Sequence, residues 1–89
     1  MTLQILIVDD DPQIAEIHRH FTEKIDGFNV CGIAGNLEDA EKMSVLLKPD
    51  LILLDLYFPE GKGTEILWNL RARHQATDVI LITAAKELD

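Results

Sequence analysis

The chain has 89 residues, of which 47% are hydrophobic, and its 16 acidic and 8 basic residues give a net charge of −8. This length allows one small domain, and the single cysteine, Cys31, excludes a disulfide framework. The negative charge argues against direct contact with nucleic acid by this segment. Because no signal peptide and no apolar run of membrane-spanning length is recognisable, we expect a cytoplasmic protein without a membrane partner.

Short apolar runs alternate with segments of helical periodicity along the chain. The apolar runs predict four strands, at residues 4–8, 29–34, 51–54 and 79–82. These runs contain little polar alternation, which is typical of strands covered on both faces. Strands that alternate with helices form βαβ units, so we predict an α/β fold with a parallel sheet in one domain, residues 1–89.

Three helices are predicted between the strands. The first begins at Pro12 with Asp11 as its N-cap and ends before Gly27, and apolar residues recur on one face of it. The second has Asn36 as its N-cap, and the third spans residues 64–74, after a loop at 56–63 that is rich in turn-forming residues. The apolar face of the first helix holds Ile14, Ile17, Phe21 and Ile25, and the buried stripe of the second holds Ala40, Met43 and Leu47.

Acidic residues follow two of the predicted strands. Asp9, Asp10 and Asp11 come directly after the first strand, and Asp55 comes directly after the third. Because the carboxyl ends of parallel strands meet at one edge of a sheet, we expect these side chains to converge. Two carboxylates about 4 Å apart repel each other by roughly 4 kcal/mol at an effective dielectric near 20, so the cluster needs a proton or a cation. An all-oxygen cluster favours Mg²⁺.

Three motifs in order carry a family resemblance. Residues 5–11, 55–63 and 80–84 resemble the successive signatures of the receiver domains of bacterial two-component response regulators. The resemblance covers essentially the whole chain. It implies a flavodoxin-like parallel sheet with strand order 2-1-3-4 and a phosphoacceptor domain rather than an enzyme.

The resemblance also implies a role for each acidic residue. Asp55 is the expected phosphoacceptor, which takes a phosphoryl group from a sensor histidine kinase. Asp10 and Asp55 are expected to bind Mg²⁺ directly and Asp9 through a water, with the backbone carbonyl of Tyr57 as a further ligand. Thr83 is expected to donate a hydrogen bond to the phosphoryl group.

The chain departs from the family pattern at its C-terminal end. The resemblance implies a further helix, a fifth strand with a Lys-Pro pair and a last helix, so the receiver is expected to be incomplete, and Lys86 cannot be assumed to replace the missing lysine. An effector domain, most often a DNA binder, is also expected in the full-length protein. The fourth strand would be an unpaired edge, which predicts a homodimer or a domain swap through that edge.

Two other functions remain open. A pseudo-receiver would serve only as an interaction module and would not be phosphorylated. A Mg²⁺-dependent phosphatase with an aspartyl-phosphate intermediate would need Asp-x-Asp-x-Thr or Val after the first strand, whereas Pro12 and Gln13 follow the acidic residues here.

Residues 15–19 and 82–85 are similar to regulators of citrate and dicarboxylate metabolism. His18, His20 and His74 are expected to be helix residues without a ligand role, and Trp68 is either core or a partner contact.

Overall fold

The computed structural model describes residues 2–55, 57–58, 61–62, 68–69, 71–73 and 77–82. The helices and strands whose two ends are both described are β1 (Leu3–Val8), α1 (Pro12–Glu23), β2 (Phe28–Ala34), α2 (Leu37–Leu47), β3 (Leu51–Asp55), β4 (Tyr57–Phe58), β5 (Gly61–Lys62) and β6 (Asp78–Ile82).

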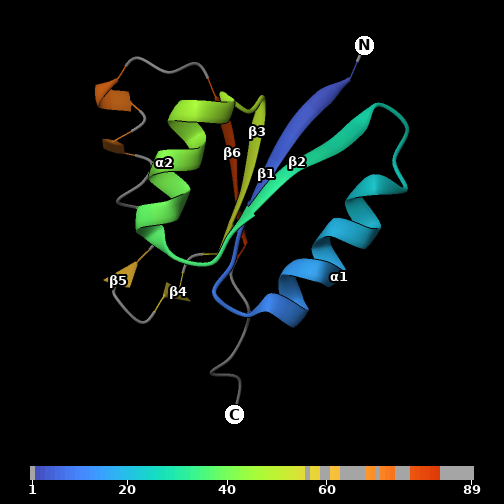
Figure 1. Ribbon diagram of the computed structural model, residues 1–89, viewed down its shortest axis with the longest axis horizontal. Helices are drawn as coiled ribbons and strands as arrows, with labels where there is room; N and C mark the ends of the chain where they lie inside the picture. Colours follow the sequence, from blue (N-terminus) through green and yellow to red (C-terminus); the bar gives the residue numbers. More distant parts are fainter. Residues whose placement is uncertain are drawn as a thin grey trace.

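Four parallel strands form the main sheet in the order β2-β1-β3-β6. The predicted α/β class and the predicted strand order 2-1-3-4 are therefore confirmed. Figure 1 shows α1 on one face of this sheet and α2 on the other, with β6 as its outer strand among the described residues. No helix in the described part of the chain is long and apolar enough to cross a membrane.

Each face of the sheet has its own core. On the α2 face, where half-buried Cys31 also packs, the buried core consists of Leu6, Val8, Ala34, Ala40, Ile52 and Leu54. Burial raises the pKa of the Cys31 thiol, which keeps it in its neutral form, as expected of a small apolar core residue. On the α1 face the buried core is smaller and consists of Ile5, Ile7 and Ala15.

Helix α1 packs on the sheet through small side chains rather than through its large apolar ones. Ala15 and Thr22 are its buried residues. The predicted apolar residues are 40% to 62% exposed: Ile14, Ile17, Phe21 and Ile25. On the same face of the sheet, Leu53 is half-buried and Ile80 is 49% exposed. Within the described residues, the expectation that both faces are covered is therefore wrong for β6 at Ile80 and only partly correct for β3.

Helix α2 begins as predicted. The Asn36 side chain accepts a hydrogen bond from the Asp39 amide at 2.7 Å and donates one to the Asp39 carboxylate at 3.1 Å. Its buried residues are Ala40 and Ser44, whereas Leu47 is 41% exposed, so the predicted stripe is only partly correct. The reason is that Ser44 is small enough to lie against the sheet and donates its hydroxyl to the carbonyl of Glu41 inside the helix.

Two predicted segments differ from the structure or are only partly described. The segment predicted as a loop contains a hairpin, since β4 and β5 pair antiparallel with Tyr57 opposite Lys62. The third helix is confirmed at residues 68–69 and 71–72, and the rest of the predicted range 64–74 lies partly outside the described residues. Trp68 is 72% exposed, which excludes the core interpretation and leaves the partner contact as a prediction.

The amino ends of the strands are joined by a set of hydrogen bonds, which we call the amino-edge clasp. The Asp50 amide donates to the Gln4 carbonyl, and the Gln4 amide donates to the Asp50 carboxylate, both at 2.8 Å. The Asp78 amide donates to the Asp50 carbonyl at 3.1 Å, and the buried Thr77 hydroxyl donates to the Pro49 carbonyl at 3.1 Å. The clasp therefore links the starts of β1, β3 and β6.

Candidate metal centre

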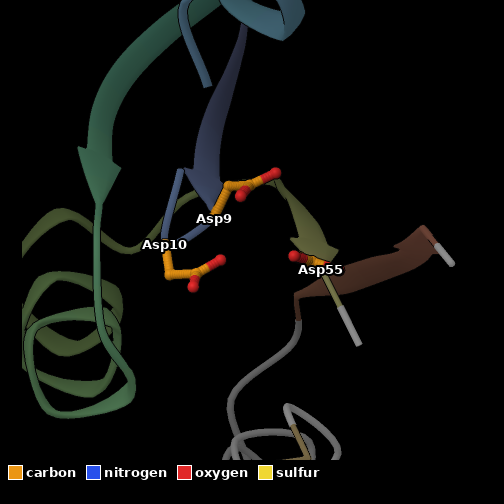
Figure 2. A group of neighbouring side chains, drawn as sticks. All are labelled: Asp9, Asp10 and Asp55. Carbon is orange, nitrogen blue, oxygen red and sulfur yellow. The ribbon is translucent and has the colours of Figure 1, made fainter. Parts of the chain in front are cut away.

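The carboxyl ends of β1 and β3 lie side by side and position two of the predicted acidic residues. Val8 pairs with Leu54 in the parallel ladder, so Asp9 and Asp55 are the next residue on each strand. Asp55 is the last residue of β3 and is opposite Ile82 of β6. Figure 2 shows the Asp9, Asp10 and Asp55 side chains around one common space at this edge of the sheet.

The three carboxylates form a compact cluster. One oxygen from each of Asp9, Asp10 and Asp55 lies within 4.8 Å of the other two. Asp9 and Asp55 are only 6% and 5% exposed, whereas Asp10 is more accessible to solvent. The predicted convergence is therefore confirmed for Asp9, Asp10 and Asp55, with two carboxylates buried and the third beside solvent, whereas the Asp11 carboxylate caps α1 instead.

Burial and crowding change the titration of Asp9. The pKa of its carboxyl group is raised above 3.8, mainly because burial disfavours the charged form and also because Asp55 and Asp10 repel it. A hydrogen bond from the Asp11 amide and the charge of His18 act in the opposite direction. Without a cation, the Asp9 carboxyl group therefore holds its proton more tightly than an ordinary aspartate does.

The donor set fits a small divalent cation bound to oxygen. Mg²⁺ binds oxygens at 2.0–2.1 Å, so opposite ligands of an octahedral ion are about 4.2 Å apart. The carboxylate oxygens of the cluster all lie within 4.8 Å of one another, close enough for one ion to contact all three. One solvent-exposed side leaves room for water or a phosphoryl oxygen. Asp9, Asp10 and Asp55 are thus a suitable carboxylate set for Mg²⁺.

Asp11 connects this cluster to α1, a link that the sequence interpretation missed. The Asp11 amide donates a hydrogen bond to Asp9 Oδ1 at 2.9 Å, which forms an aspartate turn. The Asp11 carboxylate in turn accepts hydrogen bonds from the amides of Gln13 at 2.9 Å and Ile14 at 3.4 Å. The predicted N-cap is confirmed. The sequence did contain a signal for this link, because Asp9 lies two residues before the N-cap Asp11, which is the spacing of an aspartate turn.

The other predicted site residues are less completely described. Tyr57 lies in β4, two residues after Asp55, and the position of its carbonyl as a ligand stays a prediction. Thr83, Lys86 and His74 lie outside the described residues. His18 is half-buried and His20 exposed on α1, as expected for helix residues.

Comparison with known proteins extends this geometry. A family model described as the response regulator receiver domain matches residues 5–89. The transcriptional regulatory protein MalR of Bacillus subtilis is 45% identical over 87 residues, which are 98% of this chain and 37% of MalR. The transcriptional regulatory protein DpiA of Escherichia coli is 41% identical over 98% of this chain and 38% of its own length.

Solved structures agree in fold. The MaeR response regulator bound to beryllium trifluoride is 44% identical, with a TM-score of 0.84 over 98% of this chain and 70% of that chain. The chain thus spans a little over a third of the curated relatives but most of this receiver structure. The sheet order, the acidic edge and the family match agree, and the chain belongs to the response regulator receiver domain family.

Proposed function

We propose that this chain is a phosphoacceptor domain in which Asp55 accepts a phosphoryl group from a phosphohistidine of a sensor histidine kinase. The observation that carries the proposal is the convergence of Asp55 with Asp9 and Asp10 at the carboxyl edge of the sheet. In the family to which the chain belongs, this edge is the expected site of phosphorylation. Beryllium trifluoride, which the similar MaeR protein binds, has the shape and charge of a phosphoryl group.

The transfer needs a nucleophile held in place and relieved of its repulsion. An Asp55 carboxylate oxygen attacks phosphorus, the bond from phosphorus to the histidine nitrogen breaks, and the imidazole leaves with the electron pair. Position 55 is fixed because it ends β3 and its backbone is paired with Ile82. A bound Mg²⁺ would offset the charges of Asp55 and the incoming phosphoryl group. Asp9 and Asp10 supply carboxylates to hold the ion, with the Tyr57 carbonyl and the Thr83 hydroxyl in the roles the family suggests.

The finer assignment concerns the longer protein. The relatives MalR and DpiA are named transcriptional regulatory proteins, and a Bacillus subtilis relative with 36% identity is named a probable C4-dicarboxylate response regulator. We infer that phosphorylation of Asp55 controls a DNA-binding effector domain in a cytoplasmic regulator that responds to carboxylate metabolites.

The test is direct phosphorylation. The protein is incubated with Mg²⁺ and acetyl phosphate, and separately with beryllium fluoride, and an acid-stable, base-labile adduct of one phosphoryl group is sought by intact mass and mapped to Asp55. We expect one adduct in the wild type and none in Asp55→Asn. Asp26→Asn, which changes an exposed carboxylate in the turn after α1, is the matched control and should react like the wild type.

The alternatives give different outcomes. Rapid turnover of many phosphomonoesters would support a phosphatase. The proposal is overturned if neither a phosphoryl adduct nor beryllium fluoride binding is found, in this chain and in a version extended at its C-terminus. A pseudo-receiver that acts through contacts alone would then remain.

A further inference from the structure

Asp11 lies between the acidic cluster and helix α1, and the family resemblance assigns it no role in binding the ion. Its backbone amide donates to one carboxylate oxygen of Asp9, and its own carboxylate accepts from two amides of the first turn of α1. One residue therefore holds an acid of the cluster with its backbone and a helix end with its side chain.

These two contacts are coupled because one residue makes both of them. Asp11 is extended, with φ −96° and ψ 109°, as an N-cap residue must be for its side chain to reach the amides that follow. The cap ties the Asp11 backbone to the first turn of α1, and the amide that donates to Asp9 belongs to that same backbone. Pro12 follows and restricts Asp11 to this extended region. Loss of the cap would therefore loosen the amide that orients Asp9.

The orientation of Asp9 matters because only one of its oxygens is engaged by Asp11. The bond to Oδ1 fixes the rotation of the carboxylate and leaves the second oxygen for the cluster. Asp9 is 6% exposed, so water provides little alternative support for a carboxylate that rotates away. Figure 2 shows the Asp9 side chain at the end of β1, where this rotation decides how near its oxygen comes to Asp10 and Asp55.

We propose that Asp11 is a positioning residue for the divalent cation: its helix cap holds Asp9 in the orientation that binds the ion. This inference rests on the proposed function, because it assumes that the cluster binds Mg²⁺. The coupling free energy between the cap and the ion is reciprocal. If the Asp11 cap favours ion binding, the bound ion favours the cap, so Mg²⁺ should also stabilise the first turn of α1.

The charge of Asp11 must be separated from its cap. Asp11→Asn removes the charge but keeps a side chain that caps helices equally well, whereas Asp11→Ala removes both. Asp11→Gly removes the side-chain cap but destabilises the helix much less than alanine does, so it serves if the alanine variant does not fold.

The experiment is a titration of the 89-residue protein with MgCl₂ alone, followed by ¹H–¹⁵N NMR. We expect Asp11→Ala to raise the Kd for Mg²⁺ about 3- to 10-fold, the range that corresponds to a lost helix cap, Asp11→Gly to raise it by less, and Asp11→Asn to leave it unchanged. Hydrogen exchange gives a second measurement. Saturating Mg²⁺ should slow exchange of the Gln13 and Ile14 amides in the wild type and in Asp11→Asn but not in Asp11→Ala.

The outcomes separate this inference from the proposed function. If the wild type binds no Mg²⁺, the proposed function fails. If the wild type binds Mg²⁺ and Asp11→Ala and Asp11→Gly bind it equally well, or if exchange of the two amides does not respond to the ion, Asp11 is only a helix cap and the inference is overturned. A large loss in Asp11→Asn would overturn it too, because the charge and not the cap would then be responsible.

Discussion

Neutralising Asp55 should stabilise the metal-free protein, although it removes the proposed phosphoacceptor. Asp55 is 5% exposed and has two other carboxylates within 4.8 Å. Two charges at that distance repel by about 3.5 kcal/mol at an effective dielectric near 20. The exposure of Asp10 reduces this repulsion, because solvent screens its charge. We therefore expect a net gain of about 1–2 kcal/mol in Asp55→Asn, since asparagine keeps the shape of the side chain.

The assay is thermal unfolding followed by circular dichroism at pH 7 in EDTA and again with Mg²⁺. A gain of this size in a domain of this length corresponds to a rise in Tm of about 5–15 °C. Mg²⁺ at ten times its Kd should stabilise the wild type by about 1.4 kcal/mol and Asp55→Asn by less. The difference in Tm between the two proteins should therefore be smaller with Mg²⁺ than in EDTA. Asp26→Asn changes the net charge equally at an exposed position and should leave Tm unchanged. If Asp55→Asn is no more stable than the wild type in EDTA, the carboxylates do not repel as the structure indicates.

Three further perturbations test other parts of the structure. Folding raises the pKa of Asp9 above 3.8, so the folded state binds the proton more tightly, and in EDTA the wild type should lose stability as pH rises through the folded pKa. Asp9→Asn should lack that loss in urea unfolding at a series of pH values, and parallel pH profiles would contradict it. Phe21→Gln should change the free energy of unfolding by less than about 1 kcal/mol, because Phe21 is 62% exposed, whereas Ile52→Ala at a fully buried position should cost about 2–5 kcal/mol; equal costs would refute the assigned burial. Ile80→Lys on β6, the outer strand among the described residues, should reduce concentration-dependent association in sedimentation velocity, and an unchanged dimer fraction would exclude this edge as the contact.

The sequence was sufficient to predict most of the sheet. Each of the four strands of the main sheet was predicted within one residue at its ends, because apolar runs and caps mark strand and helix boundaries. Periodicity also placed the large apolar residues of α1 on one face. It could not show that Ala15 and Thr22 make the contact with the sheet, because periodicity identifies residues that share a face but not the surface that covers it.

The candidate site was predicted to a similar depth. Asp9, Asp10 and Asp55 converge because parallel topology brings strand ends together, which a sequence pattern can reveal. The hydrogen bond from Asp11 to Asp9 depends on side-chain rotation and backbone angles, which residue types alone do not determine. The hairpin of β4 and β5 was missed because strands of two residues are too short to show alternation.

The amino-edge clasp has a consequence for the spacing of the carboxylates at the opposite end of the sheet. Asp55 stands five residues into β3, about 16 Å along the strand from the clasp at Asp50. A slip of β3 by one residue against β1 would move Asp55 by about 3.3 Å and turn it to the other face of the sheet. The clasp therefore fixes the register of β3 against β1, and with it the position of Asp55, without contacting the site itself. Substitutions at Asp50 or Thr77 would be read in a mutational scan as losses of activity at a distance, although their origin is the alignment of the strands.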